Sequence, residues 1–212
     1  MTVSAPSPSF GKSTEARPRL LVVLALLGFF YAAIGCITGW SSVITFTSPH
    51  ERFTSAMQHE AGHMPDLPQT LGTPDQLERV ALRKAEALWS RRGVLLPMAI
   101  ASIVTSTLML FGIGGAVMRR LAWGRSAWQL SALLALVGVA LEGAFGFVHS
   151  RDLVRAVAGL DDPLSLQLPS LLPMRDAMVV TQALVSVAYL AGTAVYLSSA
   201  RVMRYCGIGA RP

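Results

Sequence analysis

Four long apolar segments constrain the fold of this chain more than any other feature of its sequence. A helix of about 20 apolar residues is long enough to cross a hydrocarbon core of about 30 Å, and each segment reaches that length. A backbone in lipid must satisfy its own hydrogen bonds, which a helix does within a single segment. We therefore predict an all-α membrane protein, a four-transmembrane-helix bundle, with spans at 20–40, 94–118, 128–149 and 177–199.

The overall composition agrees with a membrane protein and argues against a nucleic-acid partner. Of the 212 residues, 52% are hydrophobic and only 14% are charged, and the mean hydropathy is +0.50. Ordinary soluble domains are more polar than this. The net charge of +6 comes from short Lys and Arg clusters at the ends of the apolar segments rather than from one basic face. We expect the lipid bilayer as the main partner and no nucleic acid.

Basic residues without neighbouring acids mark one side of the predicted membrane domain. Such clusters precede the first span, join the second span to the third and follow the fourth, whereas the other two connections mix acids and bases. Because cytoplasmic segments carry an excess of Lys and Arg, both termini are predicted to be cytoplasmic, in the plasma (inner) membrane. The chain then divides into a flexible cytoplasmic tail at 1–19, a membrane domain at 20–199 and a basic cytoplasmic tail at 200–212. Tryptophans near the span ends are predicted to lie at the membrane interfaces: Trp40, Trp89, Trp123 and Trp128.

The longest connection, residues 41–93, is predicted to form an extracytoplasmic layer of one or two amphipathic helices. Thr73, Pro74 and Gln76 give a helix-start signal: a capping residue, a proline at the first helical position and a glutamine three residues after the cap. The apolar residues that follow recur at helical spacing. The other elements predicted outside the membrane are a shorter helix at 51–64, a short helix at 153–160 and an extended loop at 163–173.

The segment His59-Glu60-Ala61-Gly62-His63 matches the H-E-x-x-H pattern of zinc enzymes. Two histidines one helical turn apart present nitrogens to one zinc ion, and the glutamate between them can deprotonate a bound water. The pentapeptide resembles the HEAGH of the membrane-anchored AAA metalloproteases, a resemblance that covers these five residues. It implies His59 and His63 as metal ligands and Glu60 as the catalytic base. The chain carries neither a nucleotide-binding loop nor an assigned third ligand.

The leading interpretation is that these two histidines lie on the polar side of an interfacial helix and bind no metal. Under the predicted topology, all the histidines lie on the outer side, where imidazoles can converge on zinc or copper. The two cysteines indicate neither a disulfide framework nor a Cys-based zinc site. We expect no cofactor in the leading interpretation and zinc in the alternative. The histidines in question are His50, His59, His63 and His149.

Glu142 places a carboxylate within the third apolar segment. An ionisable side chain in hydrocarbon is costly, and it indicates either a functional site or a specific packing partner. His149 lies about two helical turns farther toward the outer side and shares a face with Glu142. The topology places polar residues of two other spans at a similar depth, and these are the predicted hydrogen-bond partners: Ser102 in the second span and Gln182 in the fourth.

Two interpretations of Glu142 remain open. It is either a site for a proton, a cation or a ligand, reached from the outer side, or a buried acid that fixes helix packing or docks another subunit. The leading prediction is a non-enzymatic membrane protein that acts through an outer-leaflet polar pocket around Glu142, or as a homo-oligomer or a partner of another membrane protein. The alternative is a metal-binding protein, in its sharpest form a zinc-dependent membrane peptidase.

Overall fold

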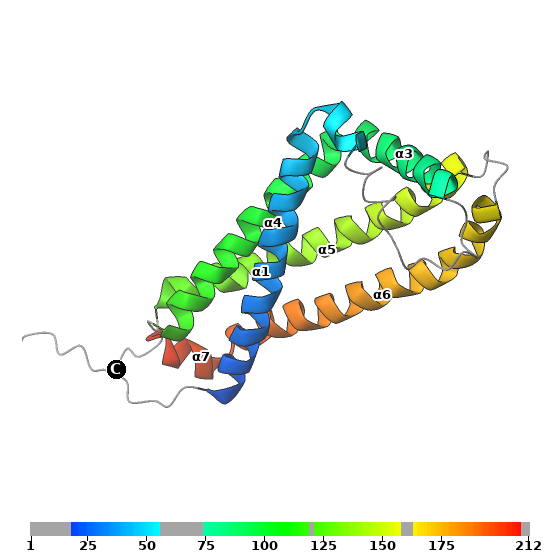
Figure 1. Cartoon of the computed structure of the whole chain (residues 1–212). Helices are drawn as coiled ribbons and strands as arrows, with labels where there is room; N and C mark the ends of the chain where they lie inside the picture. Colours follow the sequence, from blue (N-terminus) through cyan, green and yellow to red (C-terminus); the bar gives the residue numbers. More distant parts are fainter. Residues whose placement is uncertain (1–17, 56–73, 119–120, 158–162, 209–212) are drawn as a thin grey trace, which may run out of the picture.

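The computed structural model describes residues 18–55, 74–118, 121–157 and 163–208, and within these ranges the regular secondary structure is entirely helical (Figure 1). Four helices are long and apolar enough to cross a membrane, as predicted. They make the chain a multi-pass membrane protein. The four helices are α1 (Arg19–Thr47), α4 (Arg92–Ile113) with its π-helical continuation η2 (Gly114–Met118), α5 (Ala122–Val157) and α6 (Pro163–Leu197).

The helices extend beyond the apolar segments that predict them. The membrane-spanning part of α5 is Ala122–Val148, and the same helix continues through most of the short helix that was predicted separately at 153–160. The extended loop predicted at 163–173 is wrong, because these residues form the first turns of α6. Pro163 suits the first helical position, where its missing N–H costs no hydrogen bond. Leucines fill much of the segment that follows, and leucine is a strong helix former.

Neighbouring long helices pack in the order α1, α4, α5 and α6. Glycines allow the backbones of α4 and α5 to lie close together. A Cβ atom at Gly112 would collide with the backbone of Trp128, and one at Gly124 would collide with the backbone of Ala116. The side chain of Trp128, which was expected at a membrane interface, is fully buried, because the helix pair closes over it.

The end of the molecule that holds Arg19 and Leu197 is called the terminal end below. A short helix, α7 (Ala200–Tyr205), folds back against it, and Val202 and Tyr205 are buried. The Tyr205 hydroxyl donates to the Val117 carbonyl at 3.3 Å, and Arg125 donates through Nη1 to the Leu197 carbonyl at 2.8 Å. These bonds satisfy carbonyls at helix ends that have no partner within their own helices. Buried side chains, most of them apolar, then fill the terminal end.

The opposite end is called the loop end below. There α3 (Pro74–Ser90) begins at the predicted proline, and residues 50–55 form a helical segment, whereas the rest of the helix predicted at 51–64 lies outside the described residues. The Trp89 ring lies 4.9 Å from the His50 ring and 5.4 Å from the Phe53 ring, between centroids. The guanidinium of Arg92 lies 4.6 Å from the centre of Trp89. This aromatic cluster joins the segment after α1 to α3 and to the start of α4.

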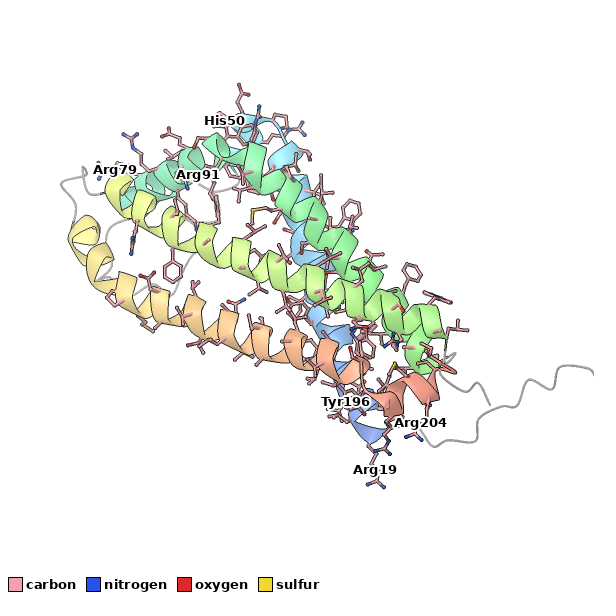
Figure 2. All side chains as sticks on the ribbon, turned by 180° about the vertical axis from the view of Figure 1, so that it is seen from behind. Arg19, His50, Arg79, Arg91, Tyr196 and Arg204 are labelled. Carbon is pink, nitrogen blue, oxygen red and sulfur yellow. The ribbon has the colours of Figure 1, made fainter. Side chains whose placement is uncertain are left out.

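The long helices do not stay together over their whole length. From the terminal end, α1 runs with α4 toward residues 50–55, whereas α6 runs with α5 toward the far end of α3 (Figure 1). The same divergence is visible from behind (Figure 2). The α1–α4 pair and the α5–α6 pair are therefore farther apart at the loop end, where α3 contacts α5.

Candidate polar site between α1, α5 and α6

Glu142 lies on the interior face of α5. Seven residues separate it from Ala135 and eighteen from Gly124, which are about two and five helical turns. The residues buried on α5 within its membrane-spanning part mark this face: Gly124, Trp128, Ser131, Ala132 and Ala135. A different stripe is exposed and suited to lipid: Leu130, Leu134, Val137 and Leu141. Glu142 thus continues the interior stripe, and its side chain is nevertheless exposed.

Tyr31 on α1 is a neighbour of Glu142 from another helix. The two side chains are within electrostatic range of each other, and the Tyr31 hydroxyl lies near the Ser186 hydroxyl on α6. Tyr31 and Ser186 are both half-buried. Three helices therefore contribute polar groups to one small site: α1 through a phenol, α5 through a carboxylate and α6 through a hydroxyl.

The floor of this site lies on its terminal side, where α1 and α6 meet. The rings of Tyr31 and Tyr189 are 5.9 Å apart between centroids. The Tyr189 hydroxyl donates to the Leu24 carbonyl at 3.0 Å. Gly28 makes this contact possible, because a Cβ atom there would lie 2.5 Å from the Tyr189 hydroxyl oxygen. Below the tyrosines lies the apolar interior of the terminal end.

The predicted partner Gln182 lies on α6 at a level near Glu142. Val179, one turn away, packs opposite Gly146 of α5, with its Cγ1 3.9 Å from where a Cβ of Gly146 would be. Gln182 is also about two turns from Tyr189, on the side of α6 that faces α1. Its side chain is exposed. A direct hydrogen bond between Gln182 and Glu142 stays a prediction.

The structure places the other two predicted pocket residues differently. Ser102 lies on α4, and its Oγ is 3.5 Å from the Gly35 carbonyl oxygen, so the contact that it makes is with α1. His149 lies on α5 about two turns beyond Glu142, as the helical spacing predicts, although its side chain is outside the described part. The grouping of Glu142, Gln182, Ser102 and His149 in one pocket stays a prediction.

An arginine lies next to this site at the loop end. Arg91, at the corner between α3 and α4, places its guanidinium carbon 5.6 Å from the centre of the Phe145 ring. Phe145 follows Glu142 by three residues, a spacing that makes the two side chains neighbours on the helix surface. Arg91 is half-buried, and Figure 2 shows it on the side of the corner that faces α5. Sequence reasoning missed Tyr31, Ser186 and Arg91, since only the crossing of the helices brings them to Glu142.

The segment with His59, Glu60 and His63 lies outside the described residues, so its zinc hypothesis stays a prediction. Within the described ranges, no three His, Cys, Asp or Glu side chains converge as a metal site would require. A comparison of the chain with protein-family models, curated protein sequences and solved structures gives no match. The proposals below therefore rest on the site itself.

Proposed function

We propose that this protein is a small four-helix membrane bundle that binds a membrane-dissolved molecule through Glu142. The observation that carries this proposal is the position of Glu142: it lies on the interior face of α5, and its side chain is nevertheless exposed. A side chain that merely fixed helix packing would be expected where the helices touch, and would therefore be buried.

The chemistry of the site favours a cationic or hydrogen-bond-donating ligand. A carboxylate in a low-dielectric environment is strongly destabilised unless a donor or a positive charge accompanies it. Among the described side chains, none forms an ion pair with Glu142. The neighbouring hydroxyl of Tyr31 lies near Ser186 on α6. A ligand with an ammonium group or several N–H donors would compensate the charge of Glu142 and would enter from the bilayer.

The distribution of basic residues supports an orientation with both termini in the cytoplasm. In that orientation the terminal end faces the cytoplasm and the site opens into the outer leaflet. The apolar interior of the terminal end then separates the site from the cytoplasm, which fits a binding protein better than a channel through the whole membrane.

The test is native mass spectrometry of the full chain purified in mild detergent, with the bound small molecules identified by mass. The wild type is expected to retain a ligand that Glu142→Gln loses by about tenfold, as removal of a charge-assisted hydrogen bond implies. Glu86→Gln is the matched control, because it makes the same chemical change on an exposed residue of α3.

Two results would overturn the proposal. One is an unchanged set of bound molecules in Glu142→Gln. The other concerns two variants together. In this result, Glu142→Gln dissociates from an oligomer or unfolds, whereas Glu142→Asp, which keeps the charge, assembles normally but binds no ligand. That pattern would assign Glu142 to helix packing or to a protein partner.

A further inference from the structure

We propose that the terminal end binds a phospholipid of net negative charge, through exposed arginines at the start of α1 and on α7. This inference goes beyond the proposed function, because it concerns the terminal end and does not involve Glu142. It is carried by the position of these arginines at the ends of the membrane spans and by the lack of acids in the chain segments around them. The arginines are Arg19, Arg201 and Arg204.

The helix α7 presents both of its arginines outward. Val202 and Tyr205 are buried against the bundle, whereas Arg201 and Arg204 are exposed. Residues three apart are neighbours on a helix surface. The two guanidinium groups therefore share the side of α7 that faces away from the bundle.

The start of α1 lies at the same end of the molecule as α7. Leu21 of α1 and Val202 of α7 belong to one buried cluster. Arg19 precedes Leu21 by two residues and is exposed. Figure 2 shows Arg19 and Arg204 at this end. The fold thus gathers basic side chains from the two ends of the chain on one end of the bundle.

The chain segments around these arginines contain no acid to balance their charge. Residues 16–50, 87–141 and 177–212 hold neither Asp nor Glu. A guanidinium group stays charged at every physiological pH. The terminal end is therefore a positively charged surface that attracts anions.

The depth of the arginines matches the phosphate layer of a bilayer. Arg19 is the first residue of its membrane span, and α7 begins three residues after the span of α6 ends at Leu197. The planar fork of N–H donors in arginine matches phosphate oxygens. In the orientation proposed above, this end meets the cytoplasmic leaflet, whose anionic lipids give it a negative surface.

Apolar side chains deeper in the membrane provide the surface for acyl chains. Leu20, Val23 and Leu27 follow Arg19 along one side of α1, and all three are exposed. A lipid with its phosphate at the arginines would lay its acyl chains along this side. The order of head group and acyl chains is then that of the bilayer itself, which favours a lipid over a soluble phosphate.

The same surface discriminates among head groups. The ammonium groups of phosphatidylethanolamine and phosphatidylcholine would meet arginines and no carboxylate, so they would be repelled. Phosphatidylglycerol carries a phosphate and no cation. We therefore expect a preference for phosphatidylglycerol over the two zwitterionic lipids.

The experiment adds one of these three lipids, with identical acyl chains, to the delipidated full chain and measures retention by native mass spectrometry. The wild type is expected to retain phosphatidylglycerol about tenfold better than the other two. Arg201→Gln/Arg204→Gln should lose most of this preference, because each basic residue near an anionic surface contributes about fivefold. Arg201→Lys/Arg204→Lys keeps the charge and should retain most of it.

The matched control is Arg52→Gln/Arg92→Gln, which removes the same charge from two exposed positions at the loop end. This variant is expected to keep the preference. If it loses as much as the α7 variant, the net charge of the protein is responsible and the proposed surface is overturned. Glu142→Gln is also expected to keep the preference, so this inference and the proposed function can fail separately.

Three further results would overturn the inference. The first is equal retention of the three lipids by the wild type, and the second is an undiminished preference in Arg201→Gln/Arg204→Gln. The third is displacement of phosphatidylglycerol by inorganic phosphate at equal concentration, which would assign the surface to soluble anions. Where the double variant does not fold, Arg201→Gln and Arg204→Gln are tested singly. Each should then lower the preference about fivefold, and no change in either contradicts the proposal.

Discussion

The hydroxyl of Tyr189 on α6 donates a hydrogen bond to the carbonyl oxygen of Leu24 on α1, at 3.0 Å, and the Tyr189 ring lies 5.9 Å from that of Tyr31. The two helices belong to opposite ends of the packing order, and this contact joins them directly. On its loop side they diverge (Figure 1). This contact therefore marks the level up to which α1 and α6 stay together.

Loss of the Tyr189 hydroxyl should weaken the connection between α1 and α6. Tyr189→Phe keeps the ring against Tyr31 and removes the bond to Leu24, so we expect a loss of about 0.5–1.5 kcal/mol in the free energy of unfolding. Thermal unfolding of the purified protein in detergent measures this loss of stability. Thr181→Ala is the control, because the Thr181 hydroxyl bonds at 2.8 Å to Ala177 within its own helix. Equal stability of the two variants would contradict the role given to Tyr189.

Glycine at position 112 should be essential for the packing of α4 on α5. A methyl group there would collide with the Trp128 backbone, which cannot move as a flexible side chain could. We expect Gly112→Ala to destabilise the protein by about 1–3 kcal/mol, the usual effect of overpacking a tight contact. In Gly192→Ala the new methyl meets open space, and alanine favours a helix, so this variant should be neutral or slightly stabilised. Detergent melting curves and size-exclusion profiles compare the two, and a stable Gly112→Ala protein would contradict the close approach.

The proposed orientation predicts which exposed positions a membrane-impermeant maleimide reaches in intact cells. In a background with Cys36 and Cys206 replaced by alanine, Ser55→Cys at the loop end should be labelled from outside. Arg201→Cys at the terminal end should be labelled only after permeabilisation. Both side chains are exposed, so accessibility within the protein does not limit the reaction. The reverse labelling pattern would place the site in the inner leaflet.

Cys206 should react slowly with alkylating reagents at neutral pH. Burial raises the pKa of its thiol above the ordinary value, and the positive charge of Arg125 opposes this shift. In a Cys36→Ser protein, we expect the alkylation rate to rise with pH through a midpoint above the value of about 8.5 for a free cysteine. As the pH rises, the thiol of Cys206 ionises in the unfolded protein before it ionises in the folded protein. At low pH the thiol is protonated in both states, so it does not change the free energy of unfolding. As the pH rises through the pKa of the thiol in the unfolded protein, the free energy of unfolding falls.

Arg125 provides the internal comparison for that measurement. Arg125→Gln removes the opposing charge, so the alkylation midpoint should move higher still, whereas Arg125→Lys keeps the charge and should hold it near the wild-type value. A midpoint at or below that of free cysteine in the wild type would show that Cys206 is not in the buried environment described.

Much of the helical structure follows from local patterns. The four spans follow from segment length and hydropathy, because a backbone in lipid has few alternatives to a helix. The start of α3 follows from Pro74, whose fixed backbone angle suits a first helical position. The residues at 163–173 show the limit of such patterns. Several prolines there favour a loop by local preference, and the structure nevertheless incorporates them into α6.

The sequence by itself determined that Glu142 is an acid in an apolar span, and helical periodicity placed it with His149 on one face of α5. Tertiary structure decided which groups accompany it. Gly28, Gly112 and Gly124 set how closely the helices approach, and those approaches bring Tyr31 and Ser186 to the carboxylate and Arg91 to Phe145 beside it. The physical reason is that a helix fixes the relative positions of residues a few turns apart, whereas neighbours from other helices depend on crossing angles. Those angles follow from packing between side chains far apart in the chain.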